Sequence, residues 1–411
     1  MRAIGQIQGL MRKLRLDAFF VLTKINRQYL SGFTGSSGVL AVAKRGAELF
    51  VDDRYLIRAR RESGVRVRKI AELHNPLSPP YLKGGTPSLR IREGGGELRI
   101  GIEDRITLRE FAGLKKQLPG RKWKVTRNLV EDLRAVKSSA ELAAIRKGAW
   151  IIDRIFWEIY KSFSPSRREG GDEEGVRTEA DIVLLIGRLA KKFGADGLAF
   201  DPIVASGPNA AAPHHNPGRD KIKKNNFLLL DFGVKVGDYH SDFTRTLFLG
   251  RPRKWQEKIY NTVLDAQEAG IASIHNSSPP PLTLRGGVKK APSLRVREGG
   301  GELRGKDVDK VVRESISSAG FGKYFTHSTG HGVGLEIHEL PNLSASSEDV
   351  LRAGEVVTVE PGIYIEEKGP PASQARALRA GGVRIEDMVY IRENGGEVLS
   401  GIPKDFKSMI I

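Results

Sequence analysis

The stretch FLLLDFGVKVGDYHSDFTRTLFL, residues 227–249, contains two runs of apolar and β-branched residues separated by Val236-Gly237. Two such runs around a glycine are typical of a β-hairpin. With these two residues as the loop, we expect Asp231 to pair directly with Asp242, which places their Cβ atoms about 4.5–5.5 Å apart. Two carboxylates this close repel each other unless one is protonated or a cation lies between them. The hairpin therefore predicts a metal site, and the alternative is a pair of exposed aspartates on its solvent side.

A second group of polar residues lies in HSTGHGVGLEIHE, residues 327–339. It contains His327, His331 and His338, which are three of the eight histidines in the chain. The glycines between them argue against one helix and favour a loop wrapped closely around a ligand. Three histidines this close together favour one shared role over three unrelated surface residues.

Two later apolar segments each contain one carboxylate, Glu360 in VVTVEPGIYI and Glu386 in GGVRIEDMVYI. A buried carboxylate without a partner is costly, so we expect both to face a cation. Four carboxylates and one imidazole suit a pair of divalent ions about 3.5–4 Å apart that acidify a water between them. The oxygen-rich donor set favours manganese, with cobalt or zinc as alternatives.

The order of these motifs resembles the pita-bread metallopeptidases, and within them the Xaa-Pro aminopeptidase and prolidase branch. The matching motifs are the two aspartates, HxxGHGxGLxxHE, VEPGIY and GVRIED. The resemblance implies that Asp231 chelates one metal ion and that Asp242 and Glu386 bridge both ions. It also implies that His331 and Glu360 complete the site of the second ion.

Further residues match the family outside the ligand set. His214 lies in the matching PHHNPG loop, and Arg384 lies in the GVRIED motif. The resemblance implies hydrolysis of the bond before proline with Glu360 as general base, and His327 or His338 stabilising the tetrahedral intermediate or assisting departure of the nitrogen. It implies that His214 shapes the substrate pocket and that Arg384 and His338 contact the substrate. A site can be shaped for proline because its ring fixes φ and its nitrogen carries no hydrogen.

The resemblance extends to the amino-terminal part of the chain. NRQYLSGFTGSSGVLAV and AELFVDDRYLIRAR are similar to the first domain of aminopeptidase P, prolidase and creatinase. We expect an α/β creatinase-like domain over residues 1–130 and a pita-bread catalytic domain over residues 138–411. The second domain is expected to be α/β with a largely antiparallel sheet, because its strands pair as hairpins. Three capping boxes each predict the start of a helix: Thr107 with Glu110, Ser138 with Glu141, and Thr178 with Asp181.

A repeated segment interrupts this organisation. TPSLRIREGGGELR (86–99) recurs as APSLRVREGGGELR (291–304) with two differences. The separation is far longer than the roughly 20–50 residues of a solenoid repeat. We interpret four segments as loop insertions, at about 79–99, 166–175, 279–304 and 367–381. Segment 279–304 carries six basic and two acidic residues. This basic excess makes RNA binding an alternative role for the segment, which we disfavour. The last segment is longer than the family's usual turn and lies where it could obstruct the site.

Composition excludes several other chemistries. The chain of 411 residues has no cysteine, which excludes disulfides, thiolate metal sites and cysteine nucleophiles. It has no apolar run of the roughly eighteen residues that a membrane helix needs, and DAFFVL is too short for a signal peptide core. We expect a cytoplasmic protein without membrane contact.

The sequence predicts a dinuclear metal-dependent Xaa-Pro aminopeptidase that acts on proline-containing peptides as a homodimer. One alternative is an Xaa-Pro dipeptidase. Another, less favoured, is a non-catalytic nucleic-acid-binding protein on the same scaffold, since creatinase shares the fold without the metal ligands. The intact set of five ligands favours the enzyme.

Overall fold

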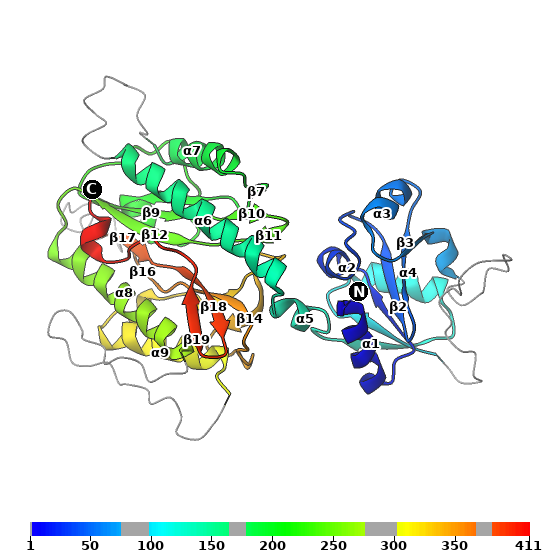
Figure 1. The fold of residues 1–411 in the computed structure, drawn as a ribbon. Coiled ribbons are helices and arrows are strands. Elements are labelled where there is room, and N and C mark those ends of the chain that lie inside the picture. The colour runs from blue at the N-terminus through cyan, green and yellow to red at the C-terminus, as the bar shows by residue number, and fades with distance from the viewer. Residues whose placement is uncertain (1, 75–97, 164–177, 276–301, 367–379) are drawn as a thin grey trace. The chain divides into compact units, whose positions relative to one another are not determined.

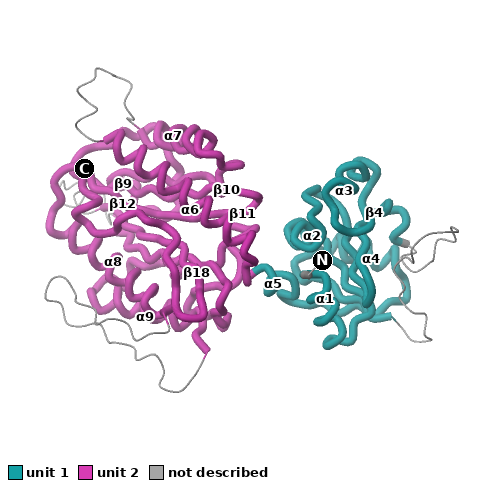
Figure 2. The backbone as a smooth tube through the Cα atoms, viewed as in Figure 1, with its two compact units in different colours: residues 1–134 teal, residues 135–411 magenta. Residues whose placement is uncertain are grey.

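The computed structural model describes residues 2–74, 98–163, 178–275, 302–366 and 380–411. Its backbone forms two compact units, residues 1–134 and 135–411 (Figures 1 and 2). The expected insertions lie almost wholly outside the described residues. At their edges, however, Arg99 begins strand β5, Arg304 caps helix α9 and Gly381 begins strand β17. None of the described helices is both long and apolar enough to span a membrane.

Unit 1 contains a six-stranded sheet in the order β4-β3-β2-β1-β5-β6. Strands β1 to β3 pair antiparallel, whereas β4, β5 and β6 join in parallel. The strands are β1 (Ala18–Val21), β2 (Val39–Ala43), β3 (Ala47–Val51), β4 (Arg66–Lys69), β5 (Arg99–Glu103) and β6 (Lys122–Thr126). The helices are α1 (Arg2–Leu14), α2 (Lys24–Ser31), α3 (Leu56–Glu62), η1 (Ile70–His74), α4 (Leu108–Gln117) and α5 (Glu131–Ala135).

Strand β1 shows why its sequence, AFFV, is continuously apolar. Phe19 and Val21 pack into one hydrophobic cluster, and Ala18 and Phe20 into another. Since successive side chains of a strand point to opposite faces, both faces of the sheet are covered.

Unit 2 surrounds its sheets with four long helices (Figure 1). These are α6 (Ser139–Ser162), α7 (Glu179–Lys192), α8 (Lys254–Ile274) and α9 (Gly305–Ser318), with short helices η3 (Gly207–Ala211), η4 (Gly322–Tyr324) and η5 (Phe406–Met409). The first strands are β7 (Gly197–Leu198), β8 (Ile203–Ser206), β9 (Asn226–Asp231), β10 (Val234–Val236), β11 (Tyr239–His240) and β12 (Thr244–Leu249). The later ones are β13 (Gly330–Gly332), β14 (Glu339–Leu343), β15 (Val356–Val359), β16 (Gly362–Ile365), β17 (Gly381–Arg384), β18 (Asp387–Arg392) and β19 (Gly395–Val398). Within the described part of this unit, every ladder between named strands is antiparallel, as predicted.

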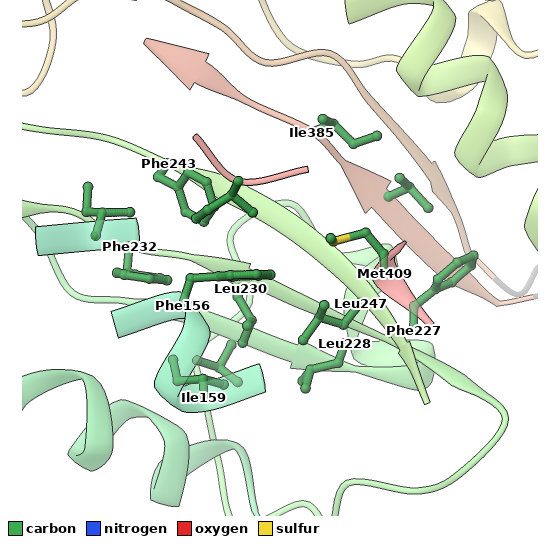
Figure 3. Packing of buried hydrophobic residues seen from close by; sticks show 14 of the residues in the cluster. Phe156, Ile159, Phe227, Leu228, Leu230, Phe232, Phe243, Leu247, Ile385 and Met409 are labelled. Carbon is green, nitrogen blue, oxygen red and sulfur yellow. The ribbon is translucent and has the colours of Figure 1, made fainter. Parts of the chain in front are cut away.

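The core of unit 2 lies between helix α6 and the sheet that contains β9 and β12 (Figure 3). Phe156 and Ile159 of α6 face Leu228 and Leu230 of β9, and all four side chains are buried. Burying a side chain of this size contributes about 1.5–3 kcal/mol. The apolar run FLLL therefore anchors the strand that ends at Asp231.

The register of the first hairpin differs from the prediction. Val236 pairs with Tyr239, so the loop is Gly237-Asp238, with φ angles of 57° and 66°. Positive φ at both positions is typical of a type I′ turn. Because the loop begins one residue later than predicted, Asp231 pairs with Thr244 instead of Asp242. The shift moves each partner by two residues, and since the side-chain period is two, Asp242 stays on the same face.

Two segments predicted as continuous strands are interrupted at their carboxylates. The chain leaves β15 at Glu360-Pro361 before β16, and it passes from β17 to β18 through Ile385-Glu386. Strand β15 pairs with β18, and β16 pairs with β17 in a separate sheet. Glu360 and Glu386 therefore both lie where the chain passes from one sheet to the other.

Candidate metal centre

A cavity of about 840 Å³ in unit 2 gathers all the candidate site residues in one place. Its lining includes the five expected ligands and the four other candidates: Asp231, Asp242, His331, Glu360, Glu386, His214, His327, His338 and Arg384. Its volume falls in the usual range of small-molecule sites. The structure thus brings together every residue that the sequence motifs selected, although the role of each stays a prediction.

Strand β13 places His331 through close backbone packing. A Cβ on Gly330 would lie 2.0 Å from the carbonyl oxygen of Thr358, and one on Gly332 would lie 2.1 Å from that of Leu340. The glycines that we interpreted as part of a loop therefore permit a short strand to pack tightly between its neighbours. The Thr358 hydroxyl accepts a hydrogen bond from the His331 backbone N–H at 3.0 Å.

The His331 ring is oriented by its own backbone. Its Nδ1 lies 3.0 Å from the carbonyl oxygen of Gly332, and since a carbonyl only accepts, Nδ1 carries the proton. Nε2 then faces the cavity, 3.2 Å from Glu360 Oε1 and 3.6 Å from Asp242 Oδ2. This tautomer leaves Nε2 as the atom that can bind a metal ion.

The charges in the metal-free site are distributed unequally. Burial opposes a charged ring at His331, but the hydrogen bond to Glu360 and the carboxylates around it outweigh burial and raise its pKa to about 9. Burial alone would raise the pKa of Glu360, yet His331 lowers it to about 2. Burial and the neighbouring Asp231 charge raise the pKa of Asp242 to about 8. Burial and Asp242 also raise the pKa of Glu386. Carboxylates this crowded either hold protons or share a cation.

The donor atoms themselves fit a metal ion. One ligand atom from each of Asp242, His331 and Glu386 lies within 4.8 Å of the others, and all three residues are buried. Glu386 Oε2 accepts a hydrogen bond from Thr244 Oγ1 at 2.6 Å, whereas its buried Oε1 has no hydrogen-bond partner among the described residues. A buried carboxylate oxygen without a hydrogen-bond partner is available to bind a cation. We conclude that this donor set fits a divalent ion.

The remaining carboxylate, Asp231, is held by an arginine. Arg384 Nη2 donates to Asp231 Oδ2, and Nη1 donates to the Tyr364 hydroxyl at 2.7 Å. The Tyr364 hydroxyl also lies 2.9 Å from His327 Nε2. Because His327 Nδ1 donates to the carbonyl oxygen of Ser328 at 2.8 Å, Nε2 of the neutral ring is the acceptor and the Tyr364 O–H is its donor. A chain of hydrogen bonds thus runs from His327 to Asp231.

The other two histidines reach the cavity differently. His338 packs edge-on against the His331 ring, with centroids 4.1 Å apart, and makes no hydrogen bond within the described residues. His214 lies in a loop that Glu179 anchors, because this buried carboxylate accepts hydrogen bonds from the backbone N–H groups of Ser206 and Gly218. Both histidines are therefore placed by neighbouring groups and keep their rings available to a ligand.

Sequence motifs missed several residues of this site. Tyr364, Thr244 and Thr358 each hydrogen-bond a candidate ligand or its partner. Tyr364 lies in VEPGIYI, four residues after Glu360, where it was interpreted only as part of an apolar strand. A tyrosine on a buried strand needs a partner for its hydroxyl, and this was the available signal.

Proton competition should control metal binding at this centre. Near neutral pH the metal-free protein holds protons on Asp242 and His331, whose pKa values are about 8 and about 9. A metal ion needs both groups deprotonated, so its apparent affinity should rise with pH by about tenfold per unit for each displaced proton, up to about pH 8. Calorimetric titration with manganese in two buffers of different ionisation enthalpy measures the protons released. A pH-independent affinity without proton release would contradict these protonation states.

Comparison with known proteins agrees with the site. The pattern of metallopeptidase family M24 matches residues 143–282 and 289–393, and that of the creatinase/prolidase N-terminal domain matches residues 4–136. The fold and the candidate metal-binding cluster of Asp242, His331 and Glu386 agree with a metallopeptidase. The chain belongs to metallopeptidase family M24.

Individual relatives cover nearly the whole chain. An uncharacterised peptidase of Bacillus subtilis, YqhT, is 32% identical over 403 residues, which cover 98% of each protein. The crystal structure of the prolidase from Pyrococcus horikoshii aligns with a TM-score of 0.78 and 29% identity, over 99% of this chain and 100% of the other. The X-Pro aminopeptidase from Thermotoga maritima aligns with a TM-score of 0.75 and 27% identity, over 99% of each chain.

Proposed function

We propose that this protein hydrolyses the peptide bond that precedes proline, with two divalent ions held by Asp231, Asp242, His331, Glu360 and Glu386. The observation that carries the proposal is the convergence of these five side chains on one cavity, with a buried Glu386 oxygen left for a cation. Prolidases and X-Pro aminopeptidases among the solved structures support this choice of substrate.

The expected ions and assembly follow from the donor set and the family. Four of the five donors are carboxylates, which favours manganese over softer metals, with cobalt or zinc as alternatives. We expect a homodimer. When bound, the two ions would polarise the substrate carbonyl and lower the pKa of a water molecule.

The chain's own residues would handle the protons and the substrate. Glu360 is ionised over most of the pH range, because His331 lowers its pKa to about 2, so it can accept the proton of the attacking water. His338 has ring nitrogens free of other hydrogen bonds within the described residues, and we assign it to the departing nitrogen. His327 is bonded through both nitrogens, so we assign it to ordering Tyr364 and Arg384.

A metal-dependent peptidase assay tests the proposal. The manganese-loaded protein should cleave Xaa-Pro peptides, lose that activity after chelation and recover it when manganese is restored. Matched peptides with alanine in place of proline should be cleaved poorly, because a site shaped for proline fits common amides badly. Failure of the metal-loaded protein to cleave any Xaa-Pro peptide would refute the proposal.

The same assay separates the two forms of the activity. Cleavage of tripeptides and longer Xaa-Pro peptides would establish the aminopeptidase that we propose, and cleavage restricted to Xaa-Pro dipeptides would establish the dipeptidase. Salt-sensitive retention of RNA without peptidase activity would instead favour the nucleic-acid-binding alternative.

A further inference from the structure

Helix α9 carries a carboxylate in its buried stripe. Asp309 is fully buried beside Val308 and Val312. It forms a two-pronged ion pair with Arg313 one turn later, with Nε to Oδ2 at 2.6 Å and Nη2 to Oδ1 at 3.1 Å. A helix needs no such group on its apolar face, and burying a carboxylate is costly. The pair therefore calls for an explanation beyond helix stability.

Both members of the pair bind the segment that carries His327. Arg313 donates to the carbonyl oxygen of His327 at 2.5 Å and to that of Phe325 at 3.3 Å, and its guanidinium lies 4.4 Å from the centroid of the Phe325 ring. Asp309 Oδ1 accepts from the backbone N–H of Thr329 at 3.1 Å and from its hydroxyl at 2.9 Å. The pair thus fixes the chain on both sides of His327.

This segment connects directly to the candidate centre. The carbonyl oxygen of Thr329 accepts the backbone N–H of Glu360 at 2.8 Å. The Phe325 ring packs edge-on against the His327 ring, with centroids 5.1 Å apart. His327 in turn accepts the Tyr364 hydroxyl, which Arg384 also contacts. A displacement of the segment would therefore reach both Glu360 and the hydrogen-bond chain to Asp231.

We propose that Asp309 and Arg313 are positioning residues that hold His327 in register with Tyr364 and Arg384. They touch no residue that we place among the metal ligands, and they act through the backbone of residues 325–329. The catalytic consequence of this inference rests on the proposed peptidase function. Misplacing a catalytic group by about 1 Å can cost about a hundredfold in rate.

The same helix offers a matched control. Lys310 and Glu314 form the adjacent pair with the same spacing, but both are exposed and lie 3.9 Å apart. Lys310→Met removes one cation from the helix as Arg313→Met does, without touching the segment. A general effect of helix charge would appear in both variants.

A double-mutant cycle tests the positioning role. We expect Arg313→Met to lower kcat by about tenfold to a hundredfold with unchanged metal content, and Lys310→Met to have no effect. In a His327→Asn background, Arg313→Met should cost no more than about twofold further, because the group that Arg313 positions is already missing and Thr329, which leads to Glu360, is bound by Asp309. Equal losses in both backgrounds, or no loss in either, would overturn the proposal.

A second measurement does not depend on peptidase activity. Diethyl pyrocarbonate modifies unprotonated histidine rings, and peptide mass spectrometry reports the rate at His327 alone. We expect this rate to rise severalfold in Arg313→Met and to stay at the wild-type value in Lys310→Met. Unchanged reactivity of His327 in Arg313→Met would overturn the positioning role even if activity fell. Absence of Xaa-Pro cleavage by the wild type would refute the proposed function. The rate of His327 modification would still show whether Arg313 positions His327.

A more conservative variant covers the case in which Arg313→Met fails to fold. Arg313→Lys keeps a cation beside Asp309 but lacks the planar fork that reaches two carbonyl oxygens. It should fold, show raised His327 reactivity and lose part of the activity. Wild-type values of both would mean that charge alone suffices, and this would also contradict positioning by geometry.

Discussion

Replacement of Asp242 by alanine is expected to abolish stable metal binding and to lower kcat/KM by at least about a thousandfold. A carboxylate oxygen of Asp242 lies within 4.8 Å of a ligand atom of His331 and of a ligand atom of Glu386. We propose that Asp242 bridges the two ions. Without bound ions, an attacking water keeps its ordinary high pKa instead of one of about 7. Elemental analysis after gel filtration measures the metal, and Xaa-Pro cleavage measures the activity.

Asp201 provides a control for this variant. It lines the same cavity but is exposed and does not belong to the ligand cluster. Asp201→Ala should therefore retain its metal. Full metal retention in Asp242→Ala together with lost activity would contradict the bridging role.

The metal-free Asp242→Ala protein should be at least as stable as the metal-free wild type at neutral pH. Burial raises the pKa of Asp242 from 3.8 to about 8, so between these values the folded state holds a proton that the unfolded state releases. The stability of the wild type therefore falls as pH rises from about 4 to about 8, and the variant should lack this part of the decline. Thermal unfolding with a chelator at several pH values measures it. A variant less stable than the wild type at pH 8 would contradict the crowded-carboxylate interpretation.

Local chemistry made much of the fold predictable. The helix starts at Ser138 and Thr178 were predicted from capping boxes, and both boxes are present in the structure. A capping box needs only residues three apart to satisfy orphan N–H groups, so local sequence is enough to predict it. The two-domain class was likewise predictable from separate motifs that resemble each domain, and the family matches to both parts of the chain support it.

Features that depend on distant partners were not predictable in the same way. The pairing of Asp231 with Thr244 depends on Asp238 adopting a positive φ of 66°. Glycine is the residue that usually indicates a positive φ in a sequence, and an aspartate only tolerates it. The breaks at Glu360 and Glu386 arise because their strands change partners between two sheets. A single sequence shows apolar runs there and cannot show which sheet each half joins.

Breaking the buried ion pair between Arg245 and Asp387 should cause a large loss of stability in unit 2. Both side chains are fully buried, with Arg245 Nη2 donating to Asp387 Oδ1 at 2.6 Å. The other oxygen of Asp387 accepts from Gln267 at 2.9 Å and lies 3.0 Å from Lys404 Nζ. Breaking a buried pair by removing one partner costs about 3–5 kcal/mol, because the other charge is left uncompensated. We therefore expect Asp387→Ala to lower the free energy of unfolding by about that amount in denaturant titrations.

The arginine of this pair also binds the backbone of two residues at the candidate metal centre. Arg245 Nη1 donates to the carbonyl oxygen of Glu386 at 2.5 Å and to that of Thr244 at 3.0 Å, so the loss of Asp387 should weaken metal binding as well as stability. Burial opposes ionisation of Asp387, but Arg245 and Lys404 lower its pKa. Its contribution is thus present above the pKa of the unfolded state and is lost as pH falls through the lower folded pKa. The difference between wild type and Asp387→Ala should shrink in acid.

An exposed ion pair in the same unit provides the comparison for Asp387→Ala. Glu397 pairs with Arg392 across the β18–β19 hairpin and with Arg146 of α6, and the two arginine side chains are 55% and 44% exposed. Such pairs contribute about 0–1 kcal/mol, so Glu397→Ala should change stability little and leave metal affinity unchanged. An Asp387→Ala variant that loses no more free energy of unfolding than Glu397→Ala at neutral pH would contradict this prediction. It would mean that the Arg245 charge is compensated by other groups, and that Arg245 binds the Glu386 carbonyl without needing the Asp387 carboxylate.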